Sequence, residues 1–480
     1  MKTSDLDLYF RALDEKLIRL SPQHADEFIK LNFPNYKHIG KYVNPLNESS
    51  RAFFLSALQD DLKDYSFDPL LSFPIDQVKY SKQVLHPDCR CFRRSKVKLR
   101  PIKTCSHRDR ILYSSWNHYL SSLHKKWLTQ HNLNHAVSAY IPETGKFNAH
   151  YAKIAFDYIQ GKEQYYAVAL DVKSFFDKIP HVELKKNLIT LLKGNKKLDV
   201  EGRLSKVDYR LLKSVTEYTF INLEDLQKVE QSLKSGNGMY FNRHRHNWDK
   251  LRKLFLIRSN KQEGIPQGLA CSGVLSNIAM MEFDLSMNQA CKKLDSMYIR
   301  YADDIFIVSE SSDSLNRLST HCRSLLDDLN LPIADNKTEE FVYSPNSNRP
   351  PTISYLGLEC TGNEITVRKN GVNKFYERTR RFIFSYVLTC RRRDIKPSRK
   401  KIRAIFSHSG KNNYYAYLKR VHEVFENDNR YKLGGIKGVL KNHVEWLDKV
   451  FDRALAVPLS EYEKKYKKHN KCTCPLQRDS

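Results

Sequence analysis

The sequence contains no long apolar run and few cysteines for its length, and each absence excludes a class of protein. Nowhere do about 18 consecutive apolar residues occur, which is the length of a membrane-spanning helix, so we expect no membrane segment. The first 20 residues, MKTSDLDLYFRALDEKLIRL, have acids throughout and no apolar core, which predicts an amphipathic helix and not a signal peptide. Ten cysteines scattered over 480 residues do not resemble a disulfide framework, which favours a reducing, cytoplasmic setting.

Acidic residues are scarce relative to basic ones. Lys and Arg number 81 against 54 Asp and Glu, so the formal net charge is +27. Such an excess repels itself in a folded protein unless a polyanion binds to it, and nucleic acid is the usual candidate. A basic protein that binds no polyanion is the alternative that composition leaves open. The 41% of hydrophobic residues predicts a globular protein of two or three packed units.

The first of three segments that indicate chemistry is YYAVALDVKSFFDKIPH, residues 165–181. Its apolar alternation predicts a buried strand that ends at Asp171. A carboxylate in that position is costly to bury unless it is paired or binds a metal ion. A capping role for Asp171 is the alternative.

The second segment is SMYIRYADDIFIVSES, residues 296–311. Two runs rich in β-branched and aromatic residues flank Ala-Asp-Asp, which predicts a hairpin with Asp303 and Asp304 at its tip. Adjacent carboxylates repel each other, and Mg²⁺, which binds one or two carboxylates together with substrate phosphates, gives a reason to present them. An ordinary solvated turn is the alternative.

The third segment is EGIPQGLACSGVLSNIAMMEFD, residues 263–284. A Gly/Pro-rich loop leads into a helix whose first turns carry small residues, which permit close approach of a ligand or another backbone. Gln267 in the loop offers both an amide donor and an acceptor. Taken alone, the loop is equally well an ordinary connection.

In this order, the three segments resemble motifs A, B and C of reverse transcriptases, and YADD is the motif C variant common in bacterial and group II intron enzymes. Four further segments extend the resemblance over about residues 90–360. They resemble, in turn, the fingers segment that meets the triphosphate, a template-contacting segment, motif D and the motif E primer grip: KLRPIKTCSHRDRI (98–111), AYIPETGK (139–146), NKTEE (336–340) and YLGLEC (355–360).

The resemblance implies an α+β right-hand polymerase in which an antiparallel palm sheet carries the catalytic Asp residues. Residues 1–85 also have the pattern of a mostly helical segment. The expected units are an N-terminal helical extension (1–85), fingers (86–165), a palm (166–360) with a helical fingers insertion at about 182–262, and a basic helical thumb and C-terminal region (361–480).

The resemblance also implies roles for single residues. Two Mg²⁺ ions, which Mn²⁺ can replace, would be held by the catalytic Asp171, Asp303 and Asp304 and by the carbonyl of Val172. Gln267, Lys98 and Arg100 would contact the incoming dNTP, with Lys96 and Lys103 as competing candidates for the triphosphate contact. Lys337 would protonate or orient the leaving pyrophosphate.

Phe176 falls at the family's sugar gate, where a bulky ring excludes a ribose 2′-hydroxyl. Core packing is the alternative, although strand alternation makes Phe175 the expected core residue. The implied primer and template contacts are Tyr355, Leu356, Gly357, Arg380 and Arg381. For the arginines, an exposed solvated face is the competing interpretation.

About 120 residues follow motif E, which is too little for a maturase region and a DNA-binding domain together. Retron elements are absent apart from a partial echo in NAHYA at 148–152. The architecture looks most like bacterial defence-associated reverse transcriptases, including the abortive-infection group. This likeness implies a structured non-coding RNA as template, a DNA product, dNTP substrates and, in some members, homo-oligomers.

The alternatives are a retron or group II intron-type enzyme, an RNA-binding scaffold that has lost synthesis, and an RNA-dependent RNA polymerase. The intact carboxylates count against the scaffold, and Phe176 and the PQG loop count against the RNA polymerase. A zinc site also remains open, because two CxC pairs, Cys89/Cys91 and Cys472/Cys474, could supply four thiolates if the chain ends meet. Free thiols are the alternative.

Overall fold

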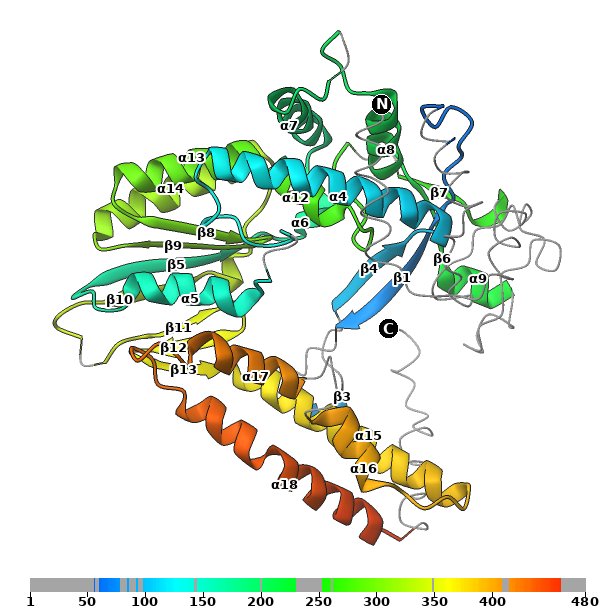
Figure 1. Cartoon of the computed structure of the whole chain (residues 1–480), viewed down its shortest axis with the longest axis vertical. Helices are drawn as coiled ribbons and strands as arrows, with labels where there is room; N and C mark the ends of the chain where they lie inside the picture. Colours follow the sequence, from blue (N-terminus) through cyan, green and yellow to red (C-terminus); the bar gives the residue numbers. More distant parts are fainter. Residues whose placement is uncertain are drawn as a thin grey trace.

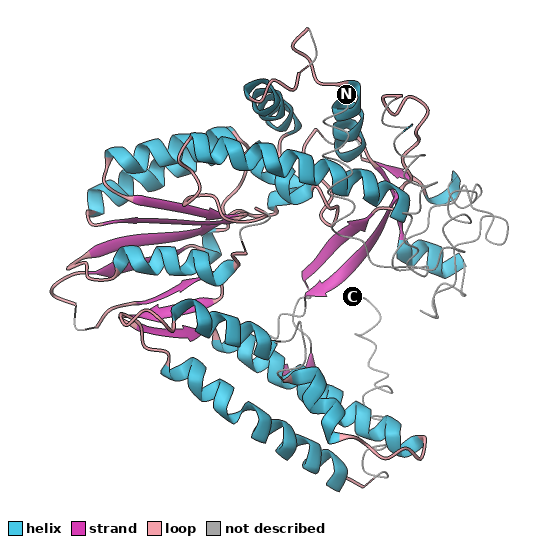
Figure 2. Cartoon of the chain, viewed as in Figure 1, coloured by secondary structure: helices cyan, strands magenta, loops and turns pink. Residues whose placement is uncertain are grey.

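The computed structural model describes residues 56, 60–77, 84–85, 92–93, 98–141, 145–198, 201–229, 253–259, 262–347, 349–407 and 414–458. It is an α+β structure of antiparallel and mixed sheets with helices packed on them (Figure 2), which confirms the α+β part of the predicted fold class. The strands are β1 (Leu70–Gln77), β2 (Val84–Leu85), β3 (Phe92–Arg93), β4 (Lys98–Thr104), β5 (Tyr165–Asp171), β6 (Thr219–Asn222), β7 (Ile257–Arg258), β8 (Met297–Tyr301), β9 (Asp304–Ser309), β10 (Glu339–Tyr343), β11 (Thr352–Tyr355), β12 (Leu358–Thr361) and β13 (Glu364–Val367). The helices are α4 (His107–Gln130), α5 (Asn148–Ile159), α6 (Phe175–Lys178), α7 (His181–Gly194), α8 (Lys206–Thr216), α9 (Leu223–Val229), α12 (Ser272–Ala279), α13 (Met281–Lys293), α14 (Ser312–Asp328), the 3₁₀ helix η2 (Asp335–Lys337), α15 (Lys369–Arg392), α16 (Arg399–Phe406), α17 (Tyr414–Phe425) and α18 (Gly434–Ala456).

The central sheet has the strand order β10-β5-β9-β8, and every pairing in it is antiparallel. Alternate residues of β5 enter different cores: Val168 and Leu170 join one cluster, and Tyr165 and Ala167 join another. Figure 1 shows α13 and α14 over one face of this sheet and α5 on the other. Because both faces are covered, the two middle strands are apolar along nearly their whole length. The strand predicted to end at Asp171 is confirmed.

The chain turns immediately after β5. Ser174 has φ +54°, in the left-handed region, and the short helix α6 begins at the next residue. Phe175 is buried and Phe176 is half-buried, so the prediction that Phe175 is the core residue is confirmed. The predicted reason was wrong, because the two rings diverge on a helix and not by strand alternation.

A second sheet has the order β4-β1-β6-β7. Its strand β1 pairs antiparallel with β4 and parallel with β6. The prediction of a helical segment over residues 1–85 is therefore wrong at Leu70–Gln77; residues 1–55 lie outside the described part of the chain. Local patterning failed here because partners distant in sequence decide the conformation of β1. The lysine-rich segment 182–262 contributes α7, α8 and α9 and also β6 and β7, both of which join this sheet.

The C-terminal helices α15–α18 form a separate layer below the three-stranded sheet β11-β12-β13 (Figure 1). A small core holds α15, α16 and α18 together through Ile383, Val387, Ile402, Leu447 and Phe451. Apolar residues recur at helical spacing from Ile436 to Leu455, which predicts a helix there, and the structure confirms it as α18. Among the described helices, none is both long and apolar enough to cross a membrane.

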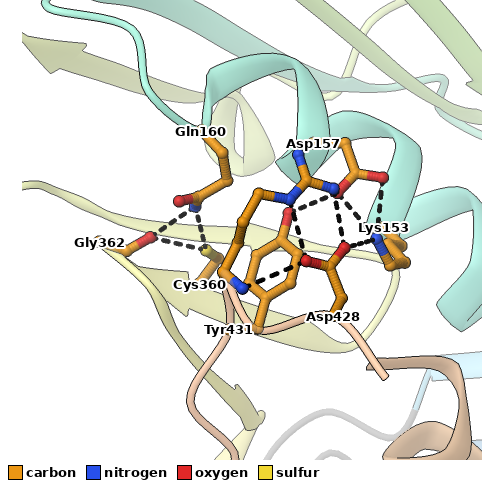
Figure 3. Close-up of polar contacts among 8 residues, drawn as sticks. Lys153, Asp157, Gln160, Cys360, Gly362, Asp428 and Tyr431 are labelled. Carbon is orange, nitrogen blue, oxygen red and sulfur yellow. Dashed lines mark hydrogen bonds and ion pairs between the residues drawn. The ribbon is translucent and has the colours of Figure 1, made fainter. Parts of the chain in front are cut away.

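Charged side chains fasten these helices to the rest of the molecule (Figure 3). Lys153 on α5 contacts Asp157, one turn away, at 2.9 Å and Asp428, in the α17–α18 connection, at 2.5 Å. Arg430 and the Tyr431 hydroxyl donate to Asp157 at 2.9 and 2.8 Å. Main-chain bonds follow immediately, because Lys432 N–H donates to the Asn363 carbonyl at 2.7 Å and the Lys432 carbonyl accepts from Ile365 N–H at 2.9 Å.

Candidate active site

Asp171, Asp303 and Asp304 come together at one end of the central sheet. Asp171 is the last residue of β5 and Asp304 the first of β9, and the two are direct partners in the antiparallel register. Tyr301 pairs with Asp304 across the β8–β9 hairpin, so Ala302 and Asp303 form a two-residue turn. Ala302 has φ +57°, as such tight turns require. The predicted hairpin is thereby confirmed, although Asp304 belongs to its strand and not to its turn.

Main-chain hydrogen bonds hold the Asp171 segment on both sides. Val172 N–H donates to the Asp303 carbonyl at 3.0 Å, which ties the strand end to the hairpin turn. On the other side, the Asp171 carbonyl accepts from Ala334 N–H at 2.8 Å, and Lys173 N–H donates to the Pro332 carbonyl at 2.7 Å. The three carboxylates thus rest on a backbone frame with little freedom.

The electrostatics of the site favour a cation. Burial, followed by the Asp303 and Asp171 charges, raises the pKa of Asp304 to about 7. Burial likewise raises the pKa of Asp303, with the Asp171 charge adding to it, while Arg100 and Lys337 oppose the shift. The Lys337 ammonium donates to the Asp171 carboxylate. The three carboxylates repel one another, and the Lys337 ammonium contacts one of them, Asp171, directly.

The donor set fits a hard divalent cation, because it consists of three carboxylates and the main-chain carbonyl of Val172, which is next in the chain. Within the described residues, no three His, Cys, Asp or Glu side chains are arranged as a ready metal-binding group. The CxC pairs Cys89/Cys91 and Cys472/Cys474 lie outside the described residues.

A pocket of about 530 Å³ joins this acidic end to the turn between β11 and β12. Asp171, Asp304 and Lys337 line one side, and the predicted primer-grip residues Tyr355, Leu356 and Gly357 line another. Leu356 (φ +49°) and Gly357 (φ +85°) both lie in the left-handed region, where Gly357 carries no steric penalty. Tyr355 is buried with its ring 4.9 Å from that of Phe306. Asp303, in the neighbouring hairpin turn, does not line this pocket.

Three of the predicted nucleotide contacts, Gln267, Phe176 and Arg100, lie where the PQG loop meets β4 and α6. The Gln267 carbonyl accepts from Lys103 N–H on β4 at 2.9 Å, and Ile265 N–H donates to the Phe176 carbonyl at 2.8 Å. Gly268 is required, because a Cβ there would lie 2.6 Å from the Lys103 carbonyl oxygen. Arg100, on the same strand, is close enough to lower the pKa of Asp303.

Of the two competing candidates for the triphosphate contact, Lys103 is described by the structure and Lys96 is not. The Lys103 side chain is buried, with its ammonium over the rings of Tyr218 and Phe220 at 5.5 and 5.3 Å. Lys96 lies outside the described residues, and Lys98 begins β4 with a side chain that is not described. Arg380 and Arg381 lie on the exposed face of α15 and do not line the pocket.

Comparison with known proteins finds a family match over part of the chain. Residues 251–360 match the family model of the reverse transcriptase (RNA-dependent DNA polymerase). This part of the chain is similar to reverse transcriptase domains. The match includes the PQG loop, α12, the YADD hairpin and YLGLEC, and it supports an RNA-directed DNA polymerase as the enzyme class. No curated protein sequence matches the chain.

Solved structures that resemble the chain include telomerases of two yeasts. Apo telomerase from Candida tropicalis has a TM-score of 0.39 and 14% identity over 84% of this chain and 67% of that one. The same protein in complex with a TWJ fragment of telomeric RNA has 0.37 and 11% over 84% and 65%, and the Candida albicans complex has 0.35 and 11% over 78% and 58%. The chain spans 60% of a C-terminally truncated C. tropicalis telomerase, at a TM-score of 0.37 and 12% identity over 66% of this chain. Similarity at this level does not specify a function.

The structure adds pocket residues that motif reasoning on the reverse transcriptase segments missed. Asn148 donates through its side chain to the Leu356 carbonyl at 2.7 Å, so it holds the β11–β12 turn. Arg368 donates through its main chain to the Gly357 carbonyl at 3.1 Å, and its charge opposes the raised pKa of Asp304. NAHYA was a visible signal for Asn148, whereas nothing in the sequence marks Arg368 among its basic neighbours.

Proposed function

We propose that this chain is an RNA-directed DNA polymerase that extends a primer by two-metal-ion nucleotidyl transfer at Asp171, Asp303 and Asp304. The observation that carries the proposal is the register of β5 and β9. It places Asp171 opposite Asp304 and puts Asp303 in the adjoining turn. The reverse transcriptase match over residues 251–360 supports the same reaction.

The polymerase parts follow from this assignment. The central sheet β10-β5-β9-β8 is the palm, the sheet β4-β1-β6-β7 with α7 and α8 belongs to the fingers, and α15–α18 form the thumb. The template–primer duplex would lie along the acidic end of the palm, between fingers and thumb. Phosphate contacts from basic residues such as Arg380 and Arg381 on α15 would hold it.

The proposed metal ligands are Asp171, Asp303, Asp304 and the Val172 carbonyl. Two Mg²⁺ ions bound there, or Mn²⁺ in their place, would lower the pKa of the primer 3′-hydroxyl and neutralise charge on the phosphoryl group. Lys337 lies at the edge of the same pocket, where its ammonium can donate a proton to the leaving pyrophosphate. Tyr355, Leu356 and Gly357 would position the primer end, because they line the same pocket as Asp171 and Asp304.

The incoming dNTP would bind on the side of Asp303 that faces β4 and the PQG loop. Arg100, with Lys98 as a second cation on the same strand, would contact the triphosphate, and Gln267 would lie against the nucleotide. Phe176 lies next to this loop and would exclude a ribose 2′-hydroxyl. These contacts give the nucleotide a fixed orientation toward the primer end.

The biological role that we propose is bacterial antiphage defence in the cytoplasm, with a structured non-coding RNA as template. Support for it comes from the sequence architecture around the reverse transcriptase motifs and from the net charge of +27.

The test is to purify the protein together with the nucleic acid that it binds, add Mg²⁺ and either dNTPs or NTPs, and sequence both bound RNA and new product. We expect DNA copied from one bound RNA, and none from NTPs alone. New RNA from NTPs would assign an RNA polymerase. Bound RNA without any product in either nucleotide mixture, and with added primer, would contradict the polymerase and favour an RNA-binding scaffold.

A further inference from the structure

A fully buried arginine lies immediately before the YADD hairpin turn. Arg300, on β8, and Asp284, on α13, both have 0% exposed side chains. They form a bidentate pair, with Arg300 Nε 2.7 Å from Asp284 Oδ1 and Arg300 Nη2 2.6 Å from Asp284 Oδ2. The Tyr298 hydroxyl donates to the same carboxylate at 2.6 Å. Burying two charges costs desolvation free energy, and this pairing offsets that cost. The pairing does not by itself explain why charged residues occupy these positions.

The remaining donors of Arg300 point to its use. Its Nη1 donates to the Ala302 carbonyl at 3.1 Å, inside the turn that carries Asp303. The next carbonyl, that of Asp303 itself, accepts from Val172 N–H at 3.0 Å. The peptide groups on both sides of the Asp303 Cα are thus held, one by a buried guanidinium and the other by the strand end that carries Asp171.

The same guanidinium reaches toward the nucleotide side. Its Nη2 donates to Asn277 Oδ1 at 3.3 Å, and Asn277 Nδ2 donates to the Ala139 carbonyl at 2.7 Å. The next residue, Tyr140, has φ +57° and its ring packs on the α12 backbone: a Cβ at Gly273 would lie 2.5 Å from it. The Tyr140 ring lies edge-on to Phe176 at 6.1 Å.

We infer that Arg300, Asp284 and Asn277 form a buried positioning network that sets the Asp303 carboxylate relative to Asp171 and sets the Tyr140 ring against Phe176. Arg300 is a positioning residue, since it acts through the Ala302 carbonyl and touches neither substrate nor primer. The inference deepens the proposed function and rests on it, because it assigns metal binding to the turn and nucleotide selection to the Tyr140 side.

The network needs arginine specifically. A planar guanidinium offers five N–H donors in a fixed fork, and here they serve Asp284, Ala302 and Asn277 together. Lysine at this position keeps the charge opposite Asp284 but lacks the fork that reaches the other two. Arg300→Lys therefore separates the positioning role from charge pairing.

The experiment measures Mn²⁺ binding by electron paramagnetic resonance and single-nucleotide incorporation on an RNA template with a DNA primer. We expect Arg300→Lys to weaken Mn²⁺ binding roughly tenfold and to lower kcat roughly 10- to 100-fold, with template–primer affinity unchanged. Leu191→Ala, which opens a cavity in the core on α7, is the control for general destabilisation, and it should leave both values within twofold. Asp303→Asn identifies the Mn²⁺ that belongs to the site.

Unchanged Mn²⁺ affinity and unchanged kcat in Arg300→Lys would overturn the inference, as would losses no larger than those of Leu191→Ala. Where Arg300→Lys does not fold, Asn277→Ala decides: the KM for dNTP should rise severalfold with kcat within twofold, and no change in KM overturns the inference. Wild-type protein that binds Mn²⁺ through Asp303 but adds no nucleotide contradicts the proposed function alone, since the Mn²⁺ arm still tests the network. If the wild-type protein binds no Mn²⁺ through Asp303, the inference is overturned, because the network would then position no metal ligand.

Discussion

Phe176 lies beside the candidate site with its ring between those of two other aromatic residues. Phe175, its neighbour on α6, is 5.6 Å away, and Tyr140 is 6.1 Å away, both in edge-on geometry. Phe176 is half-buried, so its ring packs against these neighbours and still presents a surface. This arrangement suits a rigid wall beside a nucleotide sugar better than a fully buried core residue.

Phe176→Ala should relax sugar selection, because removing the ring opens space for a ribose 2′-hydroxyl. We expect the ratio of NTP to dNTP incorporation, each measured as kcat/KM, to rise at least about tenfold. Phe175→Leu, a change in the adjacent buried ring, should lower thermal stability and leave that ratio unchanged. An unaltered ratio in Phe176→Ala would place the sugar gate elsewhere.

His124 on α4 is buried in the main core, 6.0 Å from the Trp127 ring, and its Nε2 has no hydrogen-bond partner within the described residues. Burial, and then the Arg300 charge, lowers the pKa of His124 to about 3. Above pH 6.5, both folded and unfolded states carry neutral His124, so this residue does not favour unfolding there. As the pH falls from 6.5 toward 3, only the unfolded state takes up the proton, and stability is lost.

His124→Gln should therefore reduce the acid sensitivity of the fold. Between pH 6.5 and 5, the wild type should lose about 1.6 kcal/mol more unfolding free energy than the variant. Urea unfolding at these two pH values measures the difference. His118→Gln, on the same helix but partly exposed, serves as the control, and equal pH dependence of all three proteins would contradict the assignment.

Single residues also mark the limit of sequence reasoning. Asp171, Asp303 and Asp304 stand out because acids interrupt apolar strands, and the resemblance to reverse transcriptase motifs A and C implies that they come together. Arg300 does not stand out, because the chain has many arginines and nothing in the sequence around this one indicates that its side chain is fully buried. Its role depends on Asp284 and Asn277, which reach it only through the packing of α12 and α13 against β8.

Among the elements, strands with both faces covered were the most predictable. β5 and β9 are apolar runs, each with an acid at one end. A two-residue turn between β8 and β9 allows only one pairing register for these two strands. β1 was not predictable, because its sequence LLSFPIDQ contains a proline and its ladder to β4 forms across a long connection. The short helix α6 was not predicted, because the chain turns into it at Ser174, whose φ is +54°, and a serine does not signal a left-handed residue.

The α17–α18 connection should be held on the molecule by Asp157 on α5. This carboxylate accepts from Lys153, Arg430 and Tyr431, and removing its charge leaves the two cations with Asp428 alone. Asp157→Asn should speed hydrogen exchange at the amides of Ile365 and Lys432 roughly tenfold, equivalent to about 1.4 kcal/mol of local stability.

Asp452→Asn is the matched control for that change. It removes a pair with Arg399 inside the C-terminal helices, away from the connection, so exchange at Ile365 and Lys432 should not change. Equal exchange in Asp157→Asn and wild type would mean that the main-chain bonds alone hold the connection.

For the whole molecule, charge and architecture agree. The net charge of +27 predicts a polyanionic partner, while three acids converge at one end of the central sheet against this positive background. A nucleic-acid enzyme needs this combination. The basic surface binds the phosphates of the nucleic acid, and bound cations allow the acidic site to come close to those phosphates.

The most direct test of the central claim is primer extension with dNTPs on an RNA template by two acid-pair variants. Asp303→Asn with Asp304→Asn should lower synthesis roughly 10³-fold or more while leaving RNA affinity nearly unchanged. Asp327→Asn with Asp328→Asn removes an equally adjacent but exposed pair on α14 and should keep wild-type activity. Synthesis retained in the Asp303/Asp304 variant would contradict the assignment of these carboxylates as the active site.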